Sequence, residues 1–390
     1  MVEEETDGGS VKSPFVIKDV NLLLWQMFIL TFPFYLLPSG LPRISDFFLV
    51  AIAIRLLVRG HFKVLPESRI AIKFLWLFVG YVFLNNSFYA LKLTDSLGVQ
   101  TFLFYIHNGM SVALVFVLYS EYGKKFLLSS YWAISVCVVL QFVLGIRDIG
   151  NPARATIFFN NPNQLGYFSL IAAAMVAYLA RVAQPKTWQV TGLFFICLML
   201  SLISLSKAAI VGVLIMLVFY GLRQPGILAI IVAIGFALFT AFPDAISVLD
   251  RAEARLSGIG TQADDNAEGR GYNRIWENAQ YLAFGASEAD QTRWTRSGRQ
   301  ELHSVFGTLI FAYGFIGCAL IGTFFYFCLR GQGYDAYPFI SIASYGFTHQ
   351  GLRFTLLWTL LAVSWCVAAE LRKRPQPEPT GNPDLALAPA

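Results

Sequence analysis

The sequence predicts an all-α protein that crosses a membrane many times. Apolar runs of about twenty residues, the length that spans a bilayer as a helix, recur along most of the chain. Hydrophobic residues make up 56% of the 390 residues, charged residues only 14%, and the mean hydropathy is +0.58. A soluble domain carries about a quarter charged residues. One polar, arginine-rich connection at 244–302 interrupts the apolar pattern, so we expect a helical bundle with one large extramembrane loop.

The length criterion predicts about twelve transmembrane helices. No small-residue cleavage site follows the first apolar run, which is therefore expected to be a retained span and not a signal peptide. The expected span cores lie at 20–37, 44–58, 70–89, 97–119, 126–146, 163–181, 188–205, 208–222, 227–243, 303–329, 336–349 and 353–371. They divide the chain into an N-terminal segment (1–19), nine spans (20–243), the long loop (244–302), three spans (303–371) and a Pro-rich tail expected to be disordered (372–390).

Lys and Arg in the short connections predict the orientation, because cytoplasmic loops are enriched in positive charge. With the N-terminus inside, every connection assigned to the cytoplasm is basic, with Arg59, Lys63 and Arg69; Lys124 and Lys125; Arg181 and Lys186; Arg223; Arg330; and Arg372, Lys373 and Arg374. The opposite connections near Ser39 and Ser87 carry little charge. Both termini are therefore expected in the cytoplasm, and the long loop is expected on the outer face, periplasmic if the cell is a bacterium.

Several functional classes have no support in the sequence. The five cysteines lie inside apolar runs without metal-ligand spacing, and no carboxylate or histidine group suggests a metal site. The chain has no phosphate-binding glycine loop, dinucleotide fingerprint or nucleophile elbow. The net charge of +5 is related to membrane topology and not to nucleic-acid binding. We therefore expect no metal, no cofactor and no nucleic-acid partner.

Two polar clusters next to apolar runs fall on the expected outer face. Arg154 precedes an Asn- and Pro-rich segment at 159–166, in which Asn163 or a neighbour could cap the next helix. A capped turn would explain the Asn and Pro residues but not Arg154. Ser204-Leu205-Ser206-Lys207 forms a very tight connection, where Lys207 either reaches the membrane surface as a long amphipathic side chain or holds a phosphate.

The long loop and its end supply a third and a fourth cluster. Arg270 and Arg274 would lie one turn apart on a helix, with Trp276 as an interfacial anchor. Two guanidinium groups on one face suit bidentate phosphate binding, although a solvated amphipathic helix would show the same pattern. His303 lies where the loop re-enters the membrane, and the glycines that follow it, Gly307, Gly314, Gly317 and Gly322, are expected to allow close helix packing.

Two further polar sites stand apart from these clusters. His107-Asn108 lies in the middle of a span, where an interhelical hydrogen bond is the favoured interpretation over a functional role. His349 and Arg353 flank the last outer turn and are expected to line the same cavity as His303.

These motifs, in this order, resemble the O-antigen ligase and polymerase superfamily of membrane proteins. The resemblance rests on Arg154 with the 159–166 segment, Ser204-Leu205-Ser206-Lys207, Gly269-Arg270 with Trp276, and His303 ahead of Tyr313-Gly314-Phe315-Ile316-Gly317. It covers about Arg154 to Gly317; the remaining spans agree only in number and hydropathy. Two positions depart from the usual pattern: Lys207 stands where the family has Arg, which puts a bidentate phosphate contact in doubt, and Ser304 where many relatives have Asn.

The resemblance implies a metal-independent glycosyltransferase of the bacterial inner membrane with a GT-C-like helical architecture. Such enzymes take a glycan from undecaprenyl pyrophosphate on the periplasmic face, and a flippase or a chain-length regulator is an expected partner. His303 would be the general base, and its neighbouring arginines would keep the imidazole neutral. Arg270 would bind the departing pyrophosphate, and substrate would also contact Arg154, Asn163, Lys207, Arg274, His349 and Arg353.

Three functions compete for this architecture. A polymerase of O-antigen or exopolysaccharide, which joins lipid-linked repeat units, is the leading hypothesis. The second is an O-antigen ligase that transfers the glycan to lipid A-core. A flippase or transporter of lipid-linked glycan is the third, but it predicts charges along mid-span paths and symmetric halves, and the sequence shows few such charges and one dominant outer loop.

Overall fold

A computed structural model describes most of the chain. The described residues are 19–37, 40–93, 97–148, 153–223, 246–257, 267–289, 291–294 and 302–373, together with residues 226, 229 and 233. All regular structure in these ranges is helical, as the sequence predicts. The expected span at 227–243, the tail from 374 onward and the N-terminal segment up to residue 18 lie outside the described residues.

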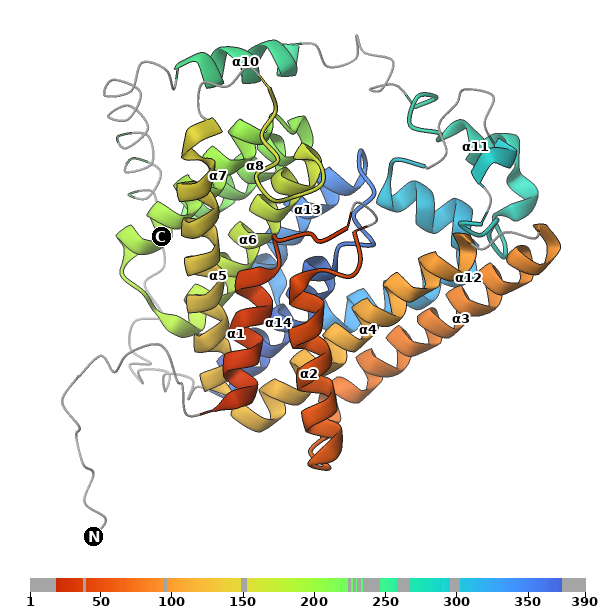
Figure 1. Cartoon of the computed structure of the whole chain (residues 1–390), viewed down its shortest axis with the longest axis horizontal. Helices are drawn as coiled ribbons and strands as arrows, with labels where there is room; N and C mark the ends of the chain where they lie inside the picture. The colour runs from red at the N-terminus through yellow and green to blue at the C-terminus, as the bar shows by residue number, and fades with distance from the viewer. Residues whose placement is uncertain are drawn as a thin grey trace, which may run out of the picture.

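The helices form a bundle, and the two labelled helices of the long loop, α10 and α11, lie along its upper side in Figure 1. The bundle contains α1 (Val20–Thr31), α2 (Ile44–Val58), α3 (Arg69–Leu93), α4 (Leu97–Tyr122), α5 (Lys124–Gly145), α6 (Pro162–Ala183), α7 (Thr187–Ser204), α8 (Lys207–Arg223), α12 (Val305–Leu329), α13 (Tyr337–Gly346) and α14 (Thr355–Arg372). The long loop contributes α10 (Ile246–Ser257), which lies across the ends of α7 and α8, and α11 (Asn273–Glu277), which lies near the end of α12 (Figure 1).

Within the described residues, seven stretches of helix are long and apolar enough to cross a membrane, which is the architecture of a multi-span membrane protein. They lie at Pro66–Leu93, Thr101–Tyr122, Lys124–Asp148, Pro162–Ala183, Thr187–Ser204, Val305–Leu329 and Thr355–Arg372. Four other helices at expected span positions are shorter: α1 has 12 residues, α2 has 15, α8 has 17 and α13 has 10. A helix of 10 residues is about 15 Å long, half the thickness of the hydrocarbon core.

Three of the described helices, α1, α6 and α12, begin at side-chain caps, with Asp19, Asn161 and Ser304 as the capping residues. The carboxylate of Asp19 accepts a bond from the Asn21 amide at 3.0 Å and starts α1. For α6 the cap is Asn161, whose side chain accepts from the Gln164 amide at 2.9 Å. Because the cap is Asn161, Asn163 lies inside the first turn, where its side chain is available for another contact.

Contacts at the lower end of the bundle in Figure 1 agree with the charge pattern along the chain. Arg181, at the end of α6, and Arg223, at the end of α8, both pair with Asp335, which precedes α13. The connections that these residues occupy are all assigned to the cytoplasmic side by their Lys and Arg content. Tyr119, near the end of α4, likewise donates to Glu370, near the end of α14, at 2.9 Å. The helices therefore alternate in direction as the sequence predicts, and we call this end of the bundle the basic end.

The α12 helix is broken at Gly314, and a segment of the long loop fills the break. Gly314 has φ +63° inside the helix, a conformation that glycine adopts readily. The backbone groups freed by the break bond to the loop: the Phe315 amide donates to Leu282 O at 2.8 Å, and Ser287 N donates to Ala312 O at 2.9 Å. A Cβ on Gly314 would lie 2.5 Å from the Gly285 nitrogen, so the backbones touch. Within a membrane bundle, backbone N–H and C=O groups that leave a regular helix must bond to other parts of the protein, as these groups bond to the loop.

This arrangement corrects the interpretation of the glycines after His303. Gly314 does allow a close approach, but to the loop backbone and not to another helix. A Cβ on Gly317 would lie 3.4 Å from the ring of Tyr81 on α3, so this glycine does face a neighbouring helix as expected, whereas a Cβ on Gly322 would have nothing within 4 Å.

Candidate functional site

A polar cavity of about 300 Å³ opens among the helix ends opposite the basic end, and we call it the outer cavity. Asn163, His303, His349 and Arg353, four of the residues that the sequence singles out, line it. The remaining walls come from Tyr35, Gly40, Leu41, Arg43, Phe104, Asn161, Gln164, Tyr167, Tyr345, Gln350 and Phe354. Segments that lie more than 300 residues apart in the chain, from Tyr35 to Phe354, therefore meet at one site.

Arg154 joins the first two polar clusters to the cavity wall. Its Nη2 donates to Oδ1 of Asn163 at 2.6 Å, and its Nε donates to the carbonyl oxygen of Ser204 at 3.1 Å. The Ala155 amide also donates to Ile203 O at 3.1 Å. The Asn-rich segment and the tight turn before Lys207 are thus bound together, which explains why a capped turn alone left Arg154 without a role.

A stack of aromatic rings positions His349 on the opposite wall. The imidazole of His349 stacks on Tyr345 with ring centroids 4.6 Å apart, and Tyr345 stacks on Tyr167 at 4.2 Å. The hydroxyl of Tyr345 donates to Asn163 O at 3.1 Å, and the ring Nδ1 of His349 lies 2.9 Å from the hydroxyl of Thr348. Stacking and hydrogen bonds together fix the plane of the imidazole.

His303 and Arg270 are neighbours through the backbone, although they are 33 residues apart in the chain. The His303 amide donates to the carbonyl oxygen of Arg270 at 3.2 Å. Nη1 of Arg270 donates to the carbonyl oxygen of Thr348, and Val305 N donates to His349 O at 3.1 Å. The end of the long loop is thus tied to the turn that carries His349, so the two histidines face one cavity with Arg270 beside them.

The side chain of Ser304 stabilises the junction between the end of the long loop, α12 and α13. Its hydroxyl donates to Gly346 O at 3.0 Å and accepts from the Gly307 amide at 3.1 Å, which caps α12. The hydroxyl of Tyr272 lies 2.5 Å from the Ser304 hydroxyl and 2.6 Å from Phe347 O. The serine therefore connects the loop, α12 and the end of α13, which gives a structural role to a position where many proteins of the resembled superfamily have Asn.

A buried charged network that the sequence analysis did not identify lies behind the cavity. Arg43 is only 2% exposed, and its guanidinium bonds to Asp46 at 3.1 Å and to the Thr355 hydroxyl at 2.7 Å. Nε2 of His107 lies 3.2 Å from Asp46. The ring Nδ1 of His107 lies 3.2 Å from the hydroxyl of Thr355, the first residue of α14, so the interhelical hydrogen bond predicted for this pair is confirmed. The adjacent Asn108 donates to Leu352 O, in the turn before α14, at 3.0 Å. Two charged residues at the start of an otherwise apolar run, Arg43 and Asp46, are the signal in the sequence that could have indicated this network.

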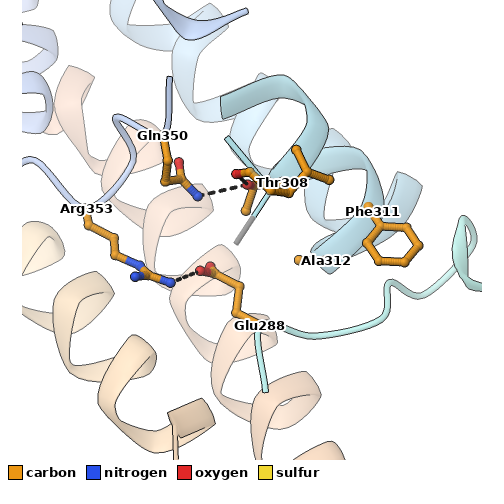
Figure 2. Close-up of a pocket in the computed structure, with 7 residues that line it drawn as sticks. Glu288, Thr308, Phe311, Ala312, Gln350 and Arg353 are labelled. Atoms are coloured by element: carbon orange, nitrogen blue, oxygen red, sulfur yellow. Dashed lines mark hydrogen bonds and ion pairs between the residues drawn. The ribbon is translucent and has the colours of Figure 1, made fainter. Parts of the chain in front are cut away.

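Glu288 is the second residue that the sequence analysis missed. Its side chain is 4% exposed and pairs with Arg353 at a small recess that continues the outer cavity (Figure 2). The hydroxyls of Tyr105, at 2.9 Å, and Tyr313 donate to the other carboxylate oxygen. Tyr105 and Tyr313 each lie eight residues inside the first residue of their helices, about 12 Å at the helical rise. The loop therefore reaches well into the bundle.

Gln350 forms the other side of the recess. Its amide donates to the Thr308 hydroxyl at 2.8 Å, across from the Glu288–Arg353 pair in Figure 2. Gln350 and Arg353 line both the recess and the outer cavity, so the two spaces share a wall. The shared wall makes the Glu288 carboxylate part of the support of the site.

Four expectations need correction, three about the long loop and one about Lys207. Arg270 precedes α11, which begins at Asn273, so Arg270 and Arg274 do not lie on one helical face. Arg274 is 4% exposed and does not line the outer cavity; burial lowers the pKa of its guanidinium. Lys207 begins α8 beside the Arg154 segment but also lies off the cavity wall. Ser287, which a loop of this kind would be expected to expose, is 1% exposed.

Four guanidinium groups lie in or beside the walls of the site. Arg43 and Arg353 are balanced by Asp46 and Glu288, while Arg154 and Arg270 bond to amide or carbonyl oxygens in the contacts described above. Within the described ranges, no group of three or more His, Cys, Asp or Glu side chains is arranged to hold a metal ion. Such a site can attract an anion through guanidinium groups and can accept a proton at either of two imidazoles.

No family model matches the chain, and a search of curated proteins found no significant match.

Proposed function

We propose that this protein is a membrane glycosyltransferase that polymerises lipid-linked oligosaccharide repeat units at the outer face of the bacterial inner membrane. The observation that carries the proposal is the convergence of Asn163, His303, His349 and Arg353 on one cavity, with Arg154 and Arg270 bonded to its walls. The sequence singles out all six residues: Arg154, Asn163, Arg270 and His303 through the motif resemblance, and His349 and Arg353 as polar residues that flank the last outer turn.

The proposed reaction is a displacement at the anomeric carbon of the donor glycan. The acceptor hydroxyl forms the new C–O bond, and the bond between that carbon and the undecaprenyl pyrophosphate oxygen breaks with its electron pair on the leaving group. His303 accepts the hydroxyl proton. Arg270, whose carbonyl oxygen bonds to the His303 amide, stabilises the charge that develops on the pyrophosphate.

The same proposal assigns the topology. The seven long helices, the shorter helices α1, α2, α8 and α13, and the 227–243 segment would give about twelve crossings, with both termini in the cytoplasm. The outer cavity would then open at the level where lipid headgroups meet the periplasm, so a lipid-linked donor would reach it from the bilayer. A flippase and a chain-length regulator are the protein partners expected of such a polymerase.

His303→Gln in the purified protein tests the chemistry directly. Glutamine keeps a hydrogen-bonding side chain but cannot accept a proton at neutral pH. We expect elongation of lipid-linked repeat units to fall by about 10²–10⁴, because that is the usual contribution of a general base, while donor binding persists. Product length on gels and donor binding would be measured on the same preparation.

Two matched histidine variants make the result specific. His61→Gln changes an imidazole near Glu121, at the basic end, and should leave elongation unchanged. His349→Gln changes the second imidazole of the cavity and should reduce the rate less than His303→Gln does. If His303→Gln elongates at the wild-type rate and His349→Gln does not, His349 is the base.

The O-antigen ligase and the flippase are distinguished by the acceptor. A polymerase lengthens lipid-linked glycan with no lipid A-core present, whereas a ligase forms product only when lipid A-core is supplied. A flippase moves donor across vesicle membranes and forms no new glycosidic bond.

A further inference from the structure

A second polar cavity, of about 270 Å³, lies at the basic end of the bundle, far along the helices from the outer cavity. The ends of α6 and α8 and the start of α13 surround it. Arg181 and Arg223 line it, together with Tyr178, Tyr220, Tyr337 and Asp335. None of these residues belongs to the site proposed for glycan transfer.

The charges in this cavity favour an anion. Nη2 of Arg181 lies 2.7 Å from Oδ2 of Asp335, and Arg223 pairs with Oδ1 of the same carboxylate. Two guanidinium groups share one carboxylate, which leaves one net positive charge among these three residues. The carboxylate also holds both guanidinium groups at the cavity wall, where planar donors suit the oxygens of a phosphate group.

A buried hydroxyl independently indicates a missing ligand. Tyr178 is 1% exposed and lines the cavity, and its hydroxyl has no hydrogen-bond partner among the described residues. Buried polar atoms in native proteins are nearly always bonded, so an unpaired hydroxyl at a cavity indicates a group that occupies the space. The oxygen of a phosphate would accept this hydroxyl as well as the arginine N–H groups.

The surroundings place the cavity at the level of lipid headgroups. Trp188, at the start of α7, is 64% exposed, as is usual for tryptophan at a membrane interface. Leu222, next to Arg223, is 75% exposed, and Val218 one turn away is 53% exposed. Apolar side chains that a lipid tail can contact therefore continue directly into the basic cavity.

We propose that the cavity formed by Tyr178, Arg181, Arg223 and Asp335 binds a phosphate-bearing anion at the cytoplasmic membrane interface. The phosphate accepts from the two guanidinium groups and from the Tyr178 hydroxyl. Its source is the headgroup of an anionic phospholipid or a soluble phosphate ester. The inference is independent of glycan transfer at the outer cavity.

Binding of phosphatidylglycerol to the full-length protein in detergent, measured by native mass spectrometry, tests this site. Phosphatidylglycerol should bind at least about tenfold more tightly than phosphatidylcholine, and Arg223→Gln should weaken it by about tenfold, because a charge-assisted bond and the net charge are both lost. Tyr178→Phe should weaken binding about threefold, because it removes only the hydroxyl. Arg330→Gln is the matched control, since Arg330 lies at the same end, packs over Phe327 and does not line the cavity.

Glycerol 3-phosphate distinguishes the two sources. If it competes at concentrations equal to those of the lipid, the site takes a soluble phosphate ester; if it does not compete, the site takes a lipid headgroup. Equal binding by wild type, Arg223→Gln and Tyr178→Phe would overturn the proposal. Asp335 would then serve only to join the ends of α6 and α8. Tyr178→Phe keeps the test decisive should Arg223→Gln fail to fold.

Discussion

The buried pair of Glu288 and Arg353 should contribute measurably to the stability of the bundle, and Glu288→Gln removes its negative charge without changing its shape. The variant leaves the Arg353 guanidinium facing a neutral amide. The hydroxyls of Tyr105 and Tyr313 can still donate to the amide oxygen, so the substitution mainly removes the ion pair with Arg353. The free energy of unfolding is therefore the quantity to measure.

The magnitude follows from the burial of the two partners. Breaking a fully buried ion pair costs about 3–5 kcal/mol. The Glu288 side chain is 4% exposed, but that of Arg353 is 27% exposed, so water screens part of the uncompensated charge. We expect Glu288→Gln to destabilise the protein by about 2 kcal/mol, below the range for full burial.

A double-mutant cycle with Arg353→Gln isolates the interaction between the two side chains. The double variant should be more stable than the sum of the single effects predicts, by about 1–2 kcal/mol, because no unpaired charge remains. Unfolding by SDS in mixed micelles, followed by circular dichroism, supplies the free energies.

Glu370→Gln is the matched control for this cycle. Glu370 also accepts from a tyrosine hydroxyl, that of Tyr119 at 2.9 Å, but its ionic partner Lys373 is 59% exposed. Its loss should cost less than about 1 kcal/mol. Strictly additive effects of Glu288→Gln and Arg353→Gln would refute the argument, as would a Glu288→Gln variant no less stable than Glu370→Gln.

The other predictions concern the outer cavity and its side of the membrane. Arg270→Lys should reduce elongation by about a hundredfold although the positive charge is kept, because the forked guanidinium group is lost. Arg251→Lys on α10 is the control, and equal elongation rates for the two variants would contradict pyrophosphate binding by Arg270. Elongation by the purified protein should continue in excess EDTA, and activity that EDTA abolishes and Mg²⁺ restores would reject charge stabilisation by side chains alone. In a background without native cysteines, Gln280→Cys should react with an impermeant maleimide in intact spheroplasts and Lys125→Cys only after lysis, and the reverse pattern would invert the topology.

Hydropathy alone predicted the helical class and the alternation of the helices, because both depend on properties that each segment carries by itself. Apolar length indicates a span, and the Lys and Arg content of the connections indicates its direction. The pairing of Arg181 and Arg223 with Asp335 agrees with the predicted alternation. The ends of short helices depend on tertiary contacts, so α13, at Tyr337–Gly346, is shorter than the 336–349 segment expected from the sequence.

The sequence predicted which residues would gather at the site better than it predicted how each is held. Asn163, His303, His349 and Arg353 meet because each lies at a helix end on the same side, and alternation of spans is enough to infer this. Local periodicity failed inside the long loop. The positive φ of Gly271 (+80°) precedes α11, so the helical spacing assumed for Arg270 and Arg274 does not exist.

Glu288 could not have been placed from the sequence, and the reason is physical. A carboxylate in a polar loop is read as solvated, because burying a charge is expensive unless a partner compensates it. Its partners are Tyr105 on α4, Tyr313 on α12 and Arg353 in the turn before α14, which are far apart in the sequence. Only the break of α12 at Gly314 lets the loop descend among them, and that break depends on backbone exchange with Leu282 and Ser287.

The long loop reaches deep into the bundle, and its contacts there help to hold the site rigid. A histidine at a loop end is held loosely, whereas His303 is fixed by the backbone of Arg270 on one side and by the Ser304 cap of α12 on the other. The same α12 helix bonds to the descending loop about two and three turns beyond this cap, at Ala312 and Phe315. A shift of the Glu288 segment would therefore move the helix that carries His303. The Glu288→Gln variant should accordingly lower elongation as well as stability, and by the same mechanism, whereas Glu370→Gln should lower neither by a comparable amount.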